Sequence, residues 1–189
     1  MTIGLRFTSA DLATFPDLPG VRYEIIDGEL HVSRQPQLRH QYAGGQLHAA
    51  LLAWSAQTGA GLPFFTPGLV FAEDNDVIPD IVWVSLGRLA EAKDTQGHLR
   101  LAPELVVEVL SPGRANEVRD RELKLSLYSR QEVQEYWIVD WEAQTVDVYR
   151  QRQGALELSD TLAGADLLTS PLLAGFSCVV SSLWTPYLA

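Results

Sequence analysis

The chain has 189 residues, 47% of them hydrophobic and 20% charged, and this balance excludes a disordered or fibrous protein. Its length suits one hydrophobic core, so we expect a single domain over residues 1–189. Fourteen Lys and Arg against twenty-four Asp and Glu give a net charge of −10, which argues against binding nucleic acid by broad neutralisation of phosphates.

The first half of the chain predicts a hairpin, a helix and two strands. Asp27-Gly28 stands between two short β-type runs, and Asp-Gly in that setting is a strong hairpin signal. Mixed spacings of three and four among Leu47, Leu51, Leu52 and Trp54 indicate the helix. Pro67-Gly68 indicates a bend or an edge position in the first strand. The acidic segment 73–76 is typical of a turn. The expected elements are a hairpin over 21–32, a helix over about 39–57, and strands over 63–72 and 79–84.

The second half contains the most informative strand. Residues 105–110 hold five aliphatic side chains and one carboxylate, Glu108, a composition typical of a strand buried on both faces. A charge in that position needs a partner, a metal ion or a shifted pKa. The expected elements are a short helix and loop over 86–99, a strand over 105–110, a helix over 114–130, strands over 134–140, 145–150 and 155–158, and a strand or short helix over 176–184.

Two carboxylates are candidates for a metal site. Asp80 opens one predicted strand and Glu108 lies within another, and the connection between them is long enough for the strands to lie side by side. Carboxylates brought together in this way repel each other unless they share a proton or a divalent cation. Mg²⁺, or Mn²⁺ in its place, suits such a site because it accepts one or two carboxylates plus waters. The alternative for Asp80 is a turn or cap residue at the start of its strand.

The predicted helix over 114–130 carries a local excess of positive charge. Its charged residues are five bases (Arg114, Arg119, Arg121, Lys124 and Arg130) and three acids (Glu117, Asp120 and Glu122). On a helical wheel Lys124 lies beside Leu127 and Tyr128, at the border of an apolar face. From residue type alone, the plainer interpretation of Lys124 is a lysine whose stem packs on the core while its ammonium reaches water.

Other kinds of site are not indicated. His40 and His48 are eight residues apart, which does not place them together as a metal pair on a helix. The sequence contains no phosphate-binding loop, no serine nucleophile elbow and no dinucleotide fingerprint. The single Cys178 excludes an internal disulfide and fits a reducing compartment. With no apolar signal core and no long apolar stretch, we expect a cytoplasmic protein that does not enter a membrane.

Seven short segments, taken in order and spacing, resemble the Uma-two family of restriction-endonuclease-like proteins, within the PD-(D/E)XK nuclease superfamily. They read RYEIIDGEL, LRHQ, PDIVWV, PELVVEVLSPG, RDRELKLSLY, QEYWIVD and LLAGFS. The resemblance covers about residues 7–185. It implies a mixed α/β fold of restriction-endonuclease type, with a central mixed sheet flanked by helices in the order α-β-β-β-α-β, and with the hairpin over 21–32 attached to the first helix.

The resemblance also implies a set of site residues. Asp80 and Glu108 correspond to the two acids that bind the metal. Lys124 looks like the family's lysine, displaced onto the helix that follows Glu108, and Glu24 looks like an additional acid at the same site. The chain departs from the superfamily pattern at Leu110, where a typical member has lysine. Activity therefore depends on whether Lys124 reaches back to Glu108.

The function implied by the resemblance is Mg²⁺- or Mn²⁺-dependent hydrolysis of phosphodiester bonds in nucleic acid, with DNA as the expected substrate and a homodimer as the expected assembly. One alternative is a catalytically inactive nuclease fold that serves as a binding or scaffold module. Leu110 in place of lysine and the acidic composition would favour this alternative. A weaker alternative is a glycosidase that uses Glu24 and Glu108 as its acid pair.

Overall fold

The computed structural model describes residues 5–92 and 97–188, and in this part of the chain the strands form one six-stranded sheet, one four-stranded sheet and one pair. The six-stranded sheet has the order β10 (Ala155–Ala163), β9 (Thr145–Arg152), β8 (Glu135–Asp140), β7 (Leu105–Val109), β6 (Ile81–Ser85) and β3 (Gly61–Phe65). The four-stranded sheet has the order β2 (Glu29–Arg34), β1 (Val21–Ile26), β5 (Asn75–Val77) and β4 (Leu69–Ala72).

The six-stranded sheet is mixed, as expected. Only β7 and β8 pair in parallel, and the remaining neighbours are antiparallel. The parallel pair is joined by the long helical segment 114–130, because two parallel strands need a crossover rather than a tight turn. Apart from β4 and β5, which belong to the four-stranded sheet, and a short helix after β6, the order along the chain is α2 (Leu38–Thr58), β3, β6, β7, this helical segment and β8. That succession confirms the predicted order α-β-β-β-α-β.

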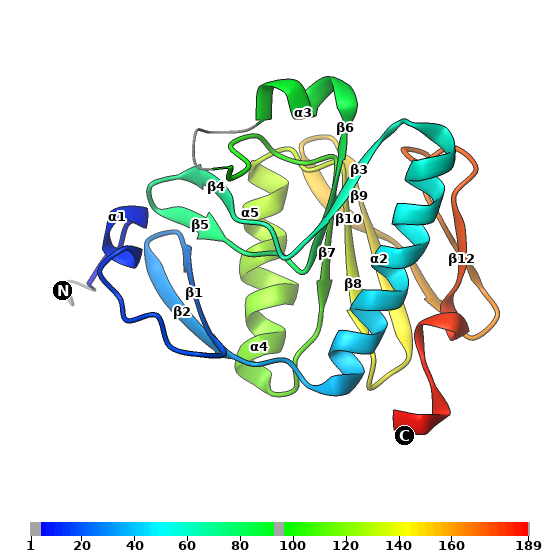
Figure 1. Cartoon of the computed structure of the whole chain (residues 1–189), viewed down its shortest axis with the longest axis horizontal. Coiled ribbons are helices and arrows are strands. Elements are labelled where there is room, and N and C mark those ends of the chain that lie inside the picture. Colours follow the sequence, from blue (N-terminus) through cyan, green and yellow to red (C-terminus); the bar gives the residue numbers. More distant parts are fainter. Residues whose placement is uncertain (1–4, 93–96, 189) are drawn as a thin grey trace.

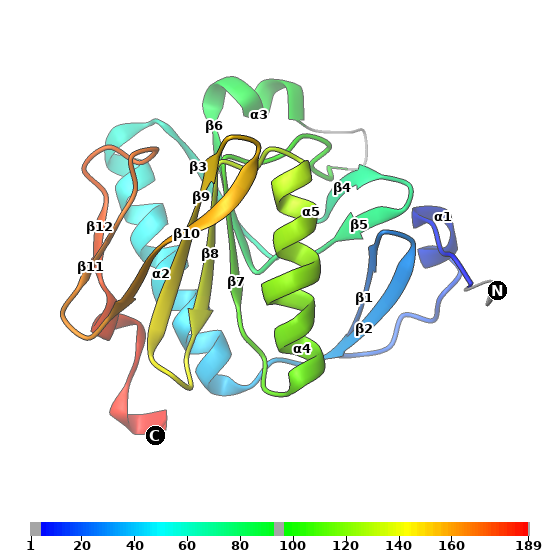
Figure 2. The ribbon, with the colours of Figure 1, turned by 180° about the vertical axis from the view of Figure 1, so that it is seen from behind.

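Helices cover both faces of this sheet (Figures 1 and 2). Along β7 and the residue that follows it, the side chains alternate between two core clusters. Leu105 and Val109 pack on the α2 side, and Val106 and Leu110 pack on the side of the helix over 114–130. Every residue of β7 is buried, as its aliphatic composition predicted. Glu108 has the same parity as Val106 and Leu110, so it faces the second helix from inside the protein.

The predicted helix over 114–130 is continuous but not uniformly α-helical. It consists of α4 (Arg114–Val118), a π-helical segment, η1 (Arg119–Lys124), and α5 (Leu125–Arg130). The π segment has one buried acid and two buried bases, namely Asp120, Arg119 and Lys124. Wide turns of this kind are frequent at functional sites. Nothing in the sequence periodicity indicated this irregularity.

The predicted hairpin over 21–32 forms as β1 and β2. Asp27 and Gly28 both have positive φ, 50° and 76°, which is the backbone of a type I′ turn and explains the Asp-Gly pair. The hairpin was expected to be only an attachment to the first helix. Instead β1 also pairs with β5, so it is a central strand of the four-stranded sheet beside α5 (Figure 1).

The single strand predicted over 63–72 is wrong in one respect, because it is two strands in different sheets. The segment over 66–68 separates β3 from β4, and Thr66 has a positive φ of 50°. Pro67 and Gly68 therefore mark a corner between sheets rather than a bend within one strand.

Short elements complete the fold. They are α1 (Ser9–Leu12), α3 (Leu86–Ala92), the pair β11 (Leu167–Thr169) and β12 (Ser177–Val179), and the 3-10 turns η2 (Val180–Leu183) and η3 (Pro186–Leu188). The region over 176–184, expected to be a strand or a helix, contains one of each. None of the helices in residues 5–92 and 97–188 combines the length and apolar character needed to span a bilayer.

Candidate active site

Asp80 lies immediately before β6, at the end of its ladder with β7. Ile81 stands opposite Val107 in that antiparallel ladder, so continuing the register by one residue sets Asp80 opposite Glu108. The backbone N–H of Val109 donates to Asp80 Oδ2 over 2.9 Å. Sequence reasoning expected two carboxylates on neighbouring strands, and the register brings these two to the same edge of the sheet.

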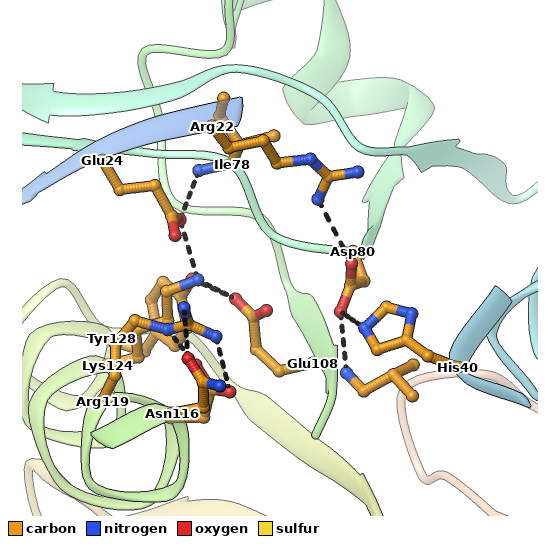
Figure 3. Close-up of polar contacts among 12 residues, drawn as sticks. Arg22, Glu24, His40, Ile78, Asp80, Glu108, Asn116, Arg119, Lys124 and Tyr128 are labelled. Atoms are coloured by element: carbon orange, nitrogen blue, oxygen red, sulfur yellow. Dashed lines mark hydrogen bonds and ion pairs between the residues drawn. The ribbon is translucent and has the colours of Figure 1, made fainter. Parts of the chain in front are cut away.

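Two basic side chains from other elements hold the Asp80 carboxylate (Figure 3). His40 Nε2, from α2, lies 3.3 Å from Oδ2, and Arg22, from β1, lies 3.5 Å from Oδ1. Burial by itself raises the pKa of Asp80, but the hydrogen bond and charge of His40, together with the Val109 N–H and Lys124, hold that pKa below its usual range. Asp80 therefore remains a carboxylate in a nearly closed environment.

Lys124 joins Glu108 to Glu24. Its Nζ lies 2.9 Å from Glu108 Oε1 and 2.8 Å from Glu24 Oε1. The side chain is only 1% exposed, so the interpretation of Lys124 as a lysine reaching water is wrong. The π segment that ends at Lys124 lies over β7, which lets the ammonium reach back to the strand acid. Tyr128 O–H, one turn further along, donates to the same Glu108 oxygen over 2.9 Å.

The three charged groups of this cluster titrate differently. Burial raises the pKa of Glu108 to about 8, because the attraction of Lys124 offsets only part of the desolvation and Asp80 adds repulsion. Burial opposes the charge on Lys124, but Glu108 and Glu24 outweigh it and raise the pKa of the ammonium. Burial also opposes the charge on Glu24, yet Lys124 and Arg119 hold the pKa of that carboxyl below its usual value.

One small cavity has all four predicted site residues in its wall. It has a volume of about 30 Å³, enough for at least one water-sized occupant. Glu24, Asp80, Glu108 and Lys124 line it, and its other lining residues include four bases: Arg22, Arg34, His40 and Arg119. Arg34 is exposed and Arg22 half-buried, so the basic groups extend from the cavity to the surface.

The donor set fits a hard divalent cation that keeps part of its hydration. Asp80 and Glu108 offer carboxylate oxygens, and Glu108 Oε2 makes neither of the contacts that tie Oε1 to Lys124 and Tyr128. Within the described residues no group of three or more His, Cys, Asp and Glu side chains is arranged as a ready metal cage. Two carboxylates plus waters suit Mg²⁺ or Mn²⁺, which accept few protein ligands, and do not suit a structural zinc ion.

Sequence reasoning missed several residues of the site. Arg22 and His40 contact Asp80, and Tyr128 contacts Glu108, yet none of them was a candidate. The hairpin offered one usable signal, because Arg22 and Glu24 are two apart on a strand and therefore share a face. His40 offered none, since the only test applied to it was its spacing from His48.

Comparisons with known proteins show the family and the fold of the chain. The model of the Uma2 family, described as "Putative restriction endonuclease", matches residues 10–181. A crystal structure from Anabaena variabilis ATCC 29413, described as "a putative nuclease belonging to DUF820", superposes with a TM-score of 0.73 at 20% sequence identity, and the match covers 94% of this chain and 97% of that one. No curated protein matches the chain in sequence. At that identity the structural match establishes the fold.

Proposed function

The chain belongs to the Uma2 family, and on this premise we propose that it is a metal-dependent nuclease that hydrolyses phosphodiester bonds of nucleic acid, with DNA as its substrate. The observation that carries the proposal is the cavity of about 30 Å³ in which Asp80 and Glu108 meet Lys124, at an edge of the sheet lined with basic side chains. The restriction-endonuclease-like fold supports the reaction class.

Asp80 and Glu108 would hold the metal ion, Mg²⁺ or Mn²⁺. When bound, such an ion supplies a more acidic water and positive charge beside the scissile phosphate. The protein contributes the orientation of the two carboxylates. His40 and the Val109 N–H fix Asp80 by two contacts to one oxygen, so His40 acts as a positioning residue.

Lys124 would act through its charge rather than as a base. The two carboxylates beside it raise the pKa of its ammonium, so it keeps its proton at neutral pH and cannot accept one from water. A protonated lysine can orient a nucleophilic water and offset the negative charge that develops on the phosphate. Its position 2.9 Å from Glu108 supports the idea that it substitutes for the lysine absent at Leu110.

Arg22 and Arg34 would contact the phosphates of the substrate. They line the same cavity as the acids, and Arg34 is exposed to solvent. Arginine forms paired hydrogen bonds with phosphate oxygens, so these two side chains suit the approach of a nucleic-acid backbone. Arg119 is engaged differently, since its Nε and Nη2 donate to the two carboxylate oxygens of Asp120 over 2.7 and 2.9 Å. We expect Arg119 to hold the π segment in place.

The proposal is tested by cleavage of supercoiled DNA and of a labelled RNA with and without Mg²⁺ or Mn²⁺. We expect metal-dependent cleavage by the unaltered protein and none by Asp80→Asn or Glu108→Gln. Asp160→Asn is the matched control, because Asp160, on β10, is a half-exposed carboxylate paired with Arg150 of β9 and does not line the cavity. Equal cleavage by Asp80→Asn and the control would refute the assignment.

A titration of the protein with Mn²⁺ followed by calorimetry separates an enzyme from a scaffold. Binding that is lost in Asp80→Asn supports the nuclease. Absence of binding at millimolar Mn²⁺ supports the catalytically inactive nuclease fold as a binding module. We also propose a homodimer, which light scattering on a size-exclusion column measures directly.

A further inference from the structure

A second and larger cavity lies beside the C-terminal turns. Its volume is about 400 Å³, within the range of small-ligand pockets. The wall is formed by the start of α2, the turn between β8 and β9, and the segment over 181–188. Figure 1 shows these three segments together at the lower edge of the molecule, where β7 and β8 also end. The proposed catalytic residues do not line this cavity.

Three aromatic side chains contribute to the wall of this cavity. Tyr42, Trp141 and Trp184 all line the cavity. Trp141 is held firmly, because its Nε1–H donates to the carbonyl of Leu110 over 2.8 Å and the guanidinium of Arg39 lies 5.4 Å from its ring centre. Such surfaces accept flat aromatic ligands, since stacking on an aromatic side chain stabilises the binding of any of the bases.

The wall also offers polar groups suited to the edge of a base. The indole Nε1–H of Trp184 is buried without a hydrogen-bond partner in the described part of the chain, although a buried indole N–H usually has one. Gln144 and Thr185 add an amide and a hydroxyl. None of the described residues that line the cavity is acidic, although the chain carries a net charge of −10. A ligand attached to phosphates is therefore not repelled by the wall itself.

At two places in the chain, consecutive residues belong to different cavities, so the two cavities lie close together. On α2, Arg39 lines the larger cavity and the next residue, His40, lines the catalytic one. After β7, Leu110 holds Trp141 of the larger cavity, and the next residue, Ser111, lines the catalytic one. A nucleic-acid strand whose phosphate lies at Asp80 and Glu108 could therefore extend one of its bases toward Trp141 and Trp184.

We propose that this cavity binds one unpaired base of the nucleic-acid strand that is cleaved, close to the scissile phosphate. The inference rests on the proposed nuclease function and adds a requirement on the substrate. A base inside a duplex is stacked on both faces and paired along its edge, so it cannot enter a cavity of this kind. The base must be single-stranded or turned out of the helix.

The first test needs no substitution. A labelled single-stranded DNA oligonucleotide is compared with a set in which one base at a time is replaced by an abasic site, using fluorescence anisotropy at low ionic strength with a chelator present. We expect the abasic site to weaken binding about ten-fold or more at one position and to have little effect elsewhere. Equal binding by all abasic oligonucleotides would overturn the proposal.

The second test removes the unpaired donor. We expect Trp184→Phe to weaken binding of the intact oligonucleotide several-fold. Binding of the oligonucleotide that is abasic at the sensitive position should stay unchanged. Trp54→Phe is the matched control, because the Trp54 Nε1–H already donates to the Ala174 carbonyl and Trp54 does not line the cavity. Thermal unfolding of both variants shows whether the fold is retained. The same loss with intact and abasic oligonucleotides would contradict a base-specific role.

The outcomes distinguish this inference from the proposed function. Base-dependent binding without metal-dependent cleavage would support the base site and refute the nuclease assignment. Metal-dependent cleavage at the same rate for every abasic oligonucleotide would support the nuclease assignment and refute the base site. If the cavity instead receives a second copy of the chain, Tyr42→Ala changes the assembly state on a size-exclusion column and the abasic series is flat, which also overturns the proposal.

Discussion

Replacing Glu108 with glutamine should remove a pH dependence of stability that is built into the site. In the metal-free protein Glu108 is buried, 3% exposed, and its pKa is raised from 4.5 to about 8. Between these two values the folded state keeps the proton and the unfolded chain releases it. The folded state therefore binds more protons, and the free energy of unfolding falls as the pH rises. Glutamine has nearly the shape of the protonated acid and does not titrate.

The size of this effect follows from the two pKa values of Glu108. A full proton difference changes the free energy of unfolding by about 1.4 kcal/mol per pH unit. The difference shrinks as the folded state itself begins to lose the proton near pH 8. From about pH 6 to about pH 8, Glu108 should therefore cost the folded protein about 2 kcal/mol relative to the Glu108→Gln variant. His31 and Lys124 are present in both proteins, so much of their own titration cancels in the comparison.

The measurement is urea unfolding of both proteins at the two pH values with a chelator present. We expect the unaltered protein to be the less stable of the two at both pH values, and the gap between them to widen by about 2 kcal/mol from the lower to the higher pH. Adding Mg²⁺ at the higher pH should stabilise the unaltered protein alone, since a cation binds the deprotonated carboxylate. Parallel pH profiles for the two proteins would refute the reasoning, because they would show that Glu108 has the same pKa in the folded and unfolded states.

Three further predictions concern the site and the sheet. Lys124→Met should lower the free energy of unfolding by about 3 kcal/mol, because it leaves the buried Glu24 carboxylate and the buried Glu108 without the ammonium that they share. Urea unfolding should show a smaller loss in a Glu108→Gln background. Mn²⁺ should raise the melting temperature of the unaltered protein, by scanning calorimetry, and not that of Asp80→Asn. Gly61→Ala should lower the free energy of unfolding by about 3 kcal/mol or more, because the new Cβ would lie 2.4 Å from a backbone carbonyl oxygen of β6. Gly45→Ala is the control, because its Cβ would meet no atom within 4 Å, and it should be neutral or stabilising in the same unfolding assay.

The sequence predicted the elements of the site better than it predicted their contacts. The aliphatic run around Glu108 indicated a strand buried on both faces, and every residue of β7 is buried. The fold order also followed from the resemblance, since its motifs lie on successive elements. These features are local, because periodicity and a strand's composition are set by residues close together in the chain.

Contacts between distant elements could not be predicted in the same way. Arg22 and His40 both reach Asp80, although 58 and 40 positions separate them from it, and neither periodicity nor composition encodes such a meeting. Lys124 shows the same difficulty on a smaller scale. Helical spacing placed it at the border of an apolar face, but only the packing of that helix on β7 buries its ammonium between two acids.

The net charge of −10 is compatible with a phosphate substrate once the charges are placed in space. Glu24 and Glu108 share the ammonium of Lys124, and Asp80 has Arg22 and His40 beside it, so every acid that lines the catalytic cavity has a basic partner. A divalent cation bound there would add further positive charge at the point where the phosphate must lie. The remaining acids are spread over the chain outside this cavity, and they should keep non-specific binding weak. Binding to nucleic acid at physiological salt should therefore depend on the metal and on few contacts, and a filter-binding series in rising salt should give a shallow slope. A steep slope without metal would instead point to a broad basic surface, which the arrangement of charges around this cavity does not provide.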